Sequence, residues 1–129
     1  MTKNQASNTI ASRVDALLAR MTLEEKIAQL GSCWMYELQT KGVLDPAKIE
    51  AKMKNGLGQL TRLAGASAYP PREVAKIGNQ IQRYIQENTR LGIPLIIHEE
   101  CCVGLVGSGA SVFPQIIGLA STFQPELAR

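Results

Sequence analysis

Aromatic side chains are scarce in this sequence, at 5% of its 129 residues, which is few for a domain with a dense core of its own. No stretch combines clustered Lys and Arg residues with aromatics, so we expect no nucleic-acid partner. No apolar run reaches about 18 residues, so we expect no membrane span. Residues 1–8 are polar and lack the apolar stretch of a signal peptide, so we expect a cytoplasmic protein.

Cysteine is almost as scarce, with only Cys33, Cys101 and Cys102 in the chain. An odd count that includes two adjacent residues does not indicate a disulfide framework. Cys101 and Cys102 also lack Cys-X-X-Cys spacing and have no neighbouring basic residue that would activate a thiol. We therefore expect reduced thiols at small buried positions, and no redox site.

Hydrophobic residues make up 45% of the sequence and charged residues 19%, which is a globular composition with a net charge of +3. After a loose polar tail over residues 1–9, apolar spacing predicts a helix with Ser12 as its N-cap. Thr22 and Glu25 have capping-box spacing, which predicts a second helix that ends at Gly31. Residues 32–44 are expected to be irregular, with Trp34, Met35 and Tyr36 as packing anchors.

Further along the chain, Asp45-Pro46 predicts the start of a short helix that ends near Asn55-Gly56. A strand is expected over residues 57–63, a long helix from Pro70-Pro71 to Gly92, and an apolar strand over residues 95–97 that is buried on both faces. These three elements form a βαβ unit, which needs neighbouring strands to be buried. We find no third strand in the pattern. A loop over residues 101–111 and a helix around residues 116–120 follow, so we expect an incomplete piece of a larger α/β protein.

The most informative stretch is His98-Glu99-Glu100, which follows the apolar strand directly. Ligands of parallel α/β proteins bind at the carboxyl ends of the strands, where a carboxylate can hold hydroxyl groups or transfer protons. The alternative is that Glu99 and Glu100 are solvated charges that open a loop; because neighbouring strand residues point in opposite directions, at most one of them is expected to face a site. Arg62, near the end of the first strand, could reach a ligand or form an ion pair across the strand ends. His98 is the only histidine, and adjacent residues cannot easily converge on one ion, so we expect no metal site and no cofactor.

Several motifs in order resemble the N-terminal domain of family 3 glycoside hydrolases, of the β-glucosidase and β-xylosidase type. They are Arg13–Leu18 with Met21–Leu30, Gly56–Arg62, Gly92–Cys101, Gly109–Gln115 and Gly118–Phe123. The resemblance covers about residues 10–129. It implies that these residues are an incomplete barrel domain with its first two βα units, and that residues 1–9 are a flexible tail.

The resemblance implies an α/β fold: the N-terminal portion of a (β/α)8 TIM-like barrel, preceded by N-terminal helices and followed in family members by a sandwich domain. Members cleave terminal β-D-glucosyl or β-D-xylosyl residues of oligosaccharides with retention. Their nucleophile is an Asp of a later barrel strand and their acid/base group usually lies beyond the barrel, so no catalytic residue is expected in this chain. Glu100 maps to the family's sugar-hydroxyl ligand, and Arg62 is a second candidate for substrate binding. Many members have His-Gly where this chain has Val103-Gly104, so a polar contact at that point is in question.

Three hypotheses follow from the sequence. The first is an N-terminal piece of a retaining β-glycosidase that lacks its remaining barrel and sandwich domain, and that by itself is inactive and folds poorly because strand edges stay exposed. The second is a non-catalytic α/β binding or interaction module, which would melt cooperatively. The third is an unrelated α/β enzyme that uses Glu99, Glu100 or Cys101.

Overall fold

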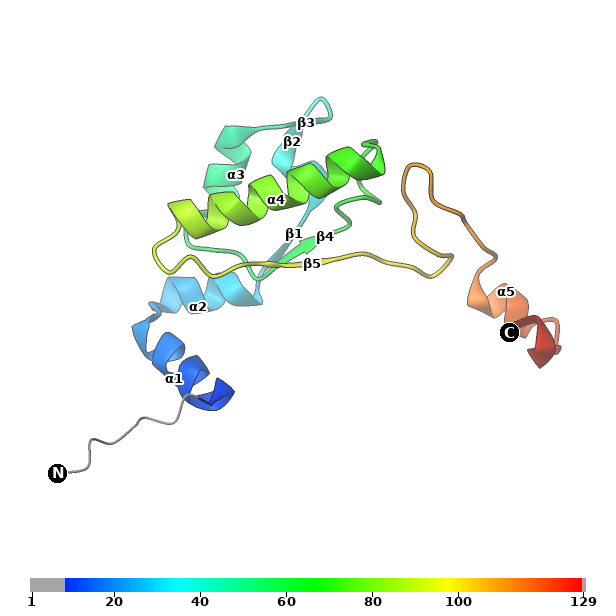
Figure 1. The fold of residues 1–129 in the computed structure, drawn as a ribbon, viewed down its shortest axis with the longest axis horizontal. Helices are drawn as coiled ribbons and strands as arrows, with labels where there is room; N and C mark the ends of the chain where they lie inside the picture. Colours follow the sequence, from blue (N-terminus) through cyan, green and yellow to red (C-terminus); the bar gives the residue numbers. More distant parts are fainter. Residues whose placement is uncertain (1–8, 129) are drawn as a thin grey trace.

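The computed structural model describes residues 9–128, without the side chain of residue 128, so the expected tail at residues 1–9 lies outside the described residues except for Thr9. Helices alternate with short strands along the chain (Figure 1). The elements are α1 (Ile10–Arg20), α2 (Leu23–Leu30), β1 (Ser32–Trp34), the 3-10 helix η1 (Met35–Leu38), β2 (Gln39–Thr40), β3 (Val43–Leu44), α3 (Pro46–Met53), β4 (Gln59–Thr61), α4 (Pro71–Asn88), β5 (Ile96–His98), α5 (Ile116–Ala120) and the 3-10 helix η2 (Pro125–Ala128).

The centre of the fold is a parallel sheet of three strands in the order β1-β4-β5. The expectation that residues 32–44 are irregular and that no third strand exists is therefore wrong. Strand β1 has only three residues, too few for an alternating pattern to stand out, and it runs directly into η1. Strands β2 and β3 form a small antiparallel pair beside it. The mixed helices and parallel sheet confirm the α/β class.

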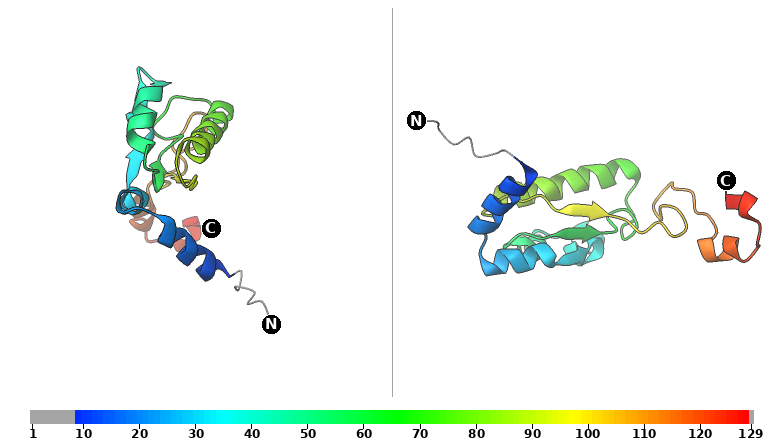
Figure 2. Two further views of the ribbon diagram at one scale, coloured as in Figure 1. Left: turned by 90° about the vertical axis from the view of Figure 1, so that its left-hand side faces the viewer. Right: turned by 90° about the horizontal axis from the view of Figure 1, so that it is seen from below.

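One face of the sheet carries the core. Helices α3 and α4 lie on that side (Figure 2), and Cys33 and Leu60, which are paired in register, are 1% and 0% exposed there. The buried apolar residues of the described chain are aliphatic or sulfur-containing, and none is aromatic. They are Cys33, Met35, Leu38, Ile49, Met53, Leu57, Leu60, Leu63, Ile77, Ile81, Ile85 and Leu95. Among the expected anchors, Met35 is buried but Tyr36 is exposed.

The opposite face of the sheet is uncovered at the row where the strands begin. Ser32, Gln59 and Ile96 occupy one register row on this face, and all three are exposed. Ile96 is 63% exposed, so the expectation that β5 is buried on both faces is wrong for the described chain. We call this the open face. Figure 2 (right) views the molecule from this side.

Helix α2 is attached to the start of the sheet. The expected capping box is confirmed, since Glu25 N–H donates to Thr22 Oγ1 (3.2 Å) and Thr22 N–H donates to Glu25 Oε2 (2.8 Å). Gly58 N–H donates to Ala28 O (3.0 Å) at the end of the helix. A Cβ on Gly58 would lie 1.9 Å from a backbone oxygen of α2, so this close approach requires glycine. Helix α1 begins earlier than expected, because Thr9 and not Ser12 is its N-cap.

Helix α4 covers the core with Ile77, Ile81 and Ile85, as its apolar spacing predicts. It starts at Pro71 as expected but ends at Asn88, four residues before Gly92. Thr89 ends it, because both its backbone N–H (3.1 Å) and its hydroxyl (2.6 Å) donate to Ile85 O. A threonine that satisfies a terminal carbonyl replaces the glycine stop that the sequence suggested.

Residues 101–128, which we call the C-terminal segment, extend away from the sheet (Figure 1). Its loop and α5 match the expectation, and η2 is a 3-10 turn. None of its described residues belongs to the core. Cys101 and Cys102 are exposed, so the prediction that they are buried is wrong. Among the described residues no helix is both long and apolar enough to cross a membrane.

Candidate functional site

The carboxyl ends of the three parallel strands lie side by side. The register pairs Trp34 with Thr61 and Thr61 with His98, so these three residues form one row across the sheet. The Thr61 hydroxyl and His98 Nε2 are hydrogen-bonded to each other. Because this row ends the strands, the residues that follow it are placed where parallel α/β proteins bind ligands.

Arg62 leaves strand β4 in a left-handed conformation, with a φ of 56°. Its backbone N–H donates to His98 O (2.8 Å), which ties the turn to β5. Its guanidinium carbon lies 5.4 Å from the centroid of the Trp34 ring, within the range of a cation–π contact. Arg62 Nη1 lies 3.7 Å from Glu100 Oε2. The ion pair considered from the sequence is therefore present, and it joins two neighbouring strand ends.

The two adjacent glutamates have different surroundings. The Glu99 carboxylate accepts hydrogen bonds from the backbone N–H groups of Ala64 (2.5 Å) and Gly65 (3.2 Å). The Glu100 side chain is 56% exposed and contacts Arg62 at its edge. For Glu99 the alternative of a solvated charge is wrong, and the two side chains do point to different places. Of the two, Glu100 has the more exposed carboxylate, and Glu99 is bonded to backbone N–H groups.

Trp34 is the site residue that the sequence analysis missed, since it was interpreted only as a packing anchor. It is half-buried, and its backbone N–H donates to Glu37 Oε1 (2.8 Å). Glu37 in turn pairs with Lys52 of α3 (2.5 Å), and this contact holds the pKa of Glu37 below its ordinary value. The position of Trp34 depends on β1, and no sequence pattern revealed that strand.

Together, Trp34, Arg62 and Glu100 suit a ligand with hydroxyl groups. A carboxylate accepts hydrogen bonds, a guanidinium donates them, and an aromatic ring offers an apolar surface beside them. Hydrolysis of a glycoside needs two carboxyl groups in reach of the bond, and of the two glutamates after β5 one is bonded to backbone N–H groups. Residues 9–128 bring together no group of three or more His, Cys, Asp or Glu side chains that could hold a metal ion.

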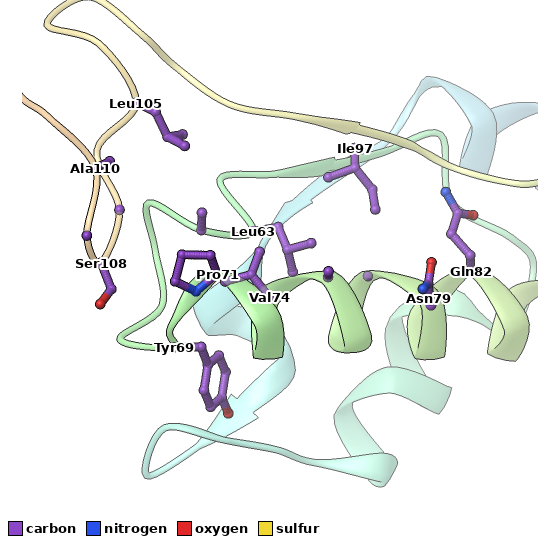
Figure 3. Close-up of a pocket in the computed structure, with 15 residues that line it drawn as sticks. Leu63, Tyr69, Pro71, Val74, Asn79, Gln82, Ile97, Leu105, Ser108 and Ala110 are labelled. Atoms are coloured by element: carbon purple, nitrogen blue, oxygen red, sulfur yellow. The ribbon is translucent and has the colours of Figure 1, made fainter.

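A separate hollow lies between α4 and the loop at residues 105–110 (Figure 3). Its volume is about 660 Å³, and its lining is mostly apolar, with Leu63, Val74 and Ile97 among the residues that face it. Trp34, Arg62 and Glu100 do not line it. The hollow is therefore distinct from the strand-end site.

Comparison with known sequences places the motifs in a family. A sequence profile described as the glycosyl hydrolase family 3 N terminal domain matches residues 22–129. The chain is 36% identical, over 95% of its length, to a protein of Formosa agariphila named "Putative beta-xylosidase". It is 33% identical to "Probable beta-glucosidase C" of Aspergillus flavus and 32% identical to "Beta-glucosidase C" of Emericella nidulans, each over 96% of its length. The chain spans only 16% to 21% of the length of these relatives.

Proposed function

The chain belongs to glycosyl hydrolase family 3, as an N-terminal domain, and we propose that it supplies a sugar-holding carboxylate, Glu100, to a β-glycosidase. Arg62 orients that carboxylate and adds hydrogen-bond donors, and Trp34 forms the wall beside it. The observation that carries the proposal is the Arg62–Glu100 pair across two neighbouring strand ends, where Glu100 is paired on one side and open to solvent on the other.

The proposed architecture is the first part of a (β/α)8 barrel, formed by residues 10–129. Parallel strands that alternate with helices support it, and so does the helix cover on one face only. In such a barrel the open face, with Ser32, Gln59 and Ile96, would face the interior. The carboxyl ends of β1, β4 and β5 would then form one sector of the rim at which barrel enzymes bind substrate.

The proposed substrates carry a terminal β-D-glucosyl or β-D-xylosyl residue, in line with the printed names of the relatives. We propose that the 129-residue chain alone does not cleave them. A single available carboxylate can hold hydroxyl groups, but it cannot act as both nucleophile and acid/base.

A hydrolysis assay tests the inactivity. The purified chain is incubated with nitrophenyl β-D-glucoside and nitrophenyl β-D-xyloside, and release of nitrophenol is followed. No release above the buffer rate is expected. Turnover that persists through purification and disappears in Glu100→Gln would contradict the proposed role, because it would make Glu100 part of the bond-cleaving machinery.

A binding measurement tests whether Glu100 holds a sugar. We expect Glu100→Gln to weaken binding of methyl β-D-glucoside or methyl β-D-xyloside roughly tenfold or more, since a charge-assisted hydrogen bond is worth about 1.5–3 kcal/mol. Ligand-observed NMR gives the affinities. Glu126→Gln in η2 is the matched control, because Glu126 is exposed and belongs to the C-terminal segment. Equal affinity of wild type and Glu100→Gln would reject the site.

A further inference from the structure

The turn after β4, residues 62–67, is held by hydrogen bonds of its own and by two outside acceptors, His98 O and the Glu99 carboxylate. Ala66 N–H donates to Arg62 O (2.8 Å), and Ser67 Oγ donates to Leu63 O (2.8 Å). Neither bond fixes the turn relative to β5. Besides the bond from Arg62 N–H to His98 O at its start, the turn is linked to this end of β5 by Glu99, whose carboxylate accepts both the Ala64 and the Gly65 N–H groups.

The guanidinium of Arg62 has few polar partners of its own among the described residues. Its Nε is buried and has no hydrogen-bond partner among the described residues. The other described contacts of the guanidinium are with the face of the Trp34 ring and, from Nη1, with Glu100 Oε2 at 3.7 Å. A buried donor without a partner costs free energy, so the surrounding backbone has to hold the side chain where it is.

Gly65 lies next to both the Arg62 side chain and the Glu99 carboxylate. A Cβ on Gly65 would lie 3.0 Å from Arg62 Nε, 3.2 Å from Glu99 Oε2 and 3.0 Å from Val106 O. The Arg62 side chain and the Glu99 carboxylate therefore lie against the same glycine. A shift of this backbone would disturb the Arg62 side chain, and the bonds from Ala64 and Gly65 N–H to Glu99 oppose such a shift.

We infer that Glu99 is a positioning residue, which fixes the turn at residues 62–67 so that the Arg62 guanidinium lies between Trp34 and Glu100. In this arrangement Glu99 does not touch the ligand. The two adjacent glutamates thus have different roles: Glu99 binds the backbone of the turn, and Glu100 faces the sugar. The inference rests on the proposed function for its consequence in binding, but the positioning itself can be measured without a ligand.

Trp34 provides the ligand-free measurement, because it is the only tryptophan of the chain and Arg62 lies over its ring. In Glu99→Ala, acrylamide quenching of Trp34 is expected to rise to the level of Arg62→Ala. The double variant Glu99→Ala/Arg62→Ala should show no further rise. Hydrogen exchange at the Ala64 and Gly65 amides should become about tenfold faster or more in Glu99→Ala, while the Ile81 amide in the core stays protected.

Two further variants make the test specific. Glu99→Gln keeps one acceptor oxygen and should restore part of both signals, which a general loss of stability would not do. Glu87→Ala, at an exposed position of α4, is the control and should leave both unchanged. Unchanged exchange at Ala64 and Gly65 in Glu99→Ala, or additive quenching in the double variant, would overturn the inference.

Affinity for methyl β-D-glucoside or methyl β-D-xyloside separates this inference from the proposed function. If Glu99 positions Arg62, Glu99→Ala and Arg62→Ala weaken binding by the same factor, and the double variant by no more than either. A wild-type chain that binds neither glycoside would count against the proposed function alone, because the Trp34 and exchange results would still decide the role of Glu99. Weaker binding in Glu99→Ala with no change at Trp34 would overturn the inference, since Glu99 would then act on the ligand directly.

Discussion

The buried core divides the chain into two regions, residues 22–98, which contain it, and the C-terminal segment at residues 101–128, which does not. The first region contains the whole buried core of the described chain, and its strands and helices pack around Leu60 and Ile81. The second contributes no residue to that core, and within it the apolar side chains of Ile116, Ile117 and Phe123 are 70% to 90% exposed. Glu99 and Glu100 lie at the junction between the two regions.

Helices α2 and α5 make the comparison sharper, because both expose apolar residues. Leu30 of α2 is 89% exposed and Ile117 of α5 is 75% exposed. Yet α2 is fastened to the sheet region, because Arg90 Nε donates to Glu25 Oε1 (2.8 Å) and Gly58 N–H donates to Ala28 O. Among the described elements, α5 packs mainly with η2. Directed polar contacts with the sheet region therefore distinguish α2 from α5.

The largest expected effect is in the core. Leu60→Ala on the central strand should lower the free energy of unfolding by about 3 kcal/mol, because it leaves a cavity where the side chain is fully buried. Ile117→Ala in α5 should change it by less than about 0.5 kcal/mol. Urea unfolding followed by Trp34 fluorescence gives both values. Similar losses for the two variants would mean that the C-terminal segment packs as firmly as the sheet.

A smaller effect on stability is expected from the contact between Arg90 and Glu25, which attaches α2 to the sheet region. The hydrogen bond from Arg90, then that from Thr22 N–H, holds the pKa of Glu25 below its ordinary value of 4.5. A carboxylate with a lowered folded-state pKa contributes stability that is full above its unfolded pKa and is lost as the pH falls through the folded value. The stability of wild type should therefore fall below about pH 4.5 more steeply than that of Glu25→Gln.

Thermal melting between pH 3 and pH 6 measures this difference. Glu50→Gln, at an exposed position of α3, is the control and should follow the wild-type curve. Parallel curves for wild type and Glu25→Gln would show that the contact with Arg90 does not fasten α2. Other carboxylates with lowered pKa values, such as Glu37 and Asp45, should leave some pH dependence in Glu25→Gln.

Local signals in the sequence predicted the elements that depend on near neighbours. The capping box of Thr22 and Glu25, the Asp45-Pro46 start of α3 and the apolar face of α4 are all confirmed. Each needs only residues within a few turns of one another, so spacing along the chain is sufficient. The α/β class followed from the same signals, because a strand, a long helix and a strand in succession form a βαβ unit.

The elements that depend on distant partners were missed. Strand β1 has only three residues, and it becomes a strand by pairing with β4. Without β1, the place of Trp34 beside Arg62 could not be predicted. The different surroundings of Glu99 and Glu100 likewise depend on Ala64 and Gly65, which are more than thirty residues away in the sequence. The exposure of Cys101 and Cys102 reflects the open packing of the C-terminal segment, which composition does not reveal.

The central claim is that the carboxyl ends of β1, β4 and β5 bind a sugar. Titration of the ¹⁵N-labelled chain with methyl β-D-glucoside and methyl β-D-xyloside, followed by residue-resolved NMR, tests it most directly. The expected shifts are at the amides of Arg62 and Glu100 and at the indole N–H of Trp34, and they should disappear in Glu100→Gln. Shifts confined to the hollow beside α4 or to the C-terminal segment, or shifts that persist in Glu100→Gln, would contradict the claim.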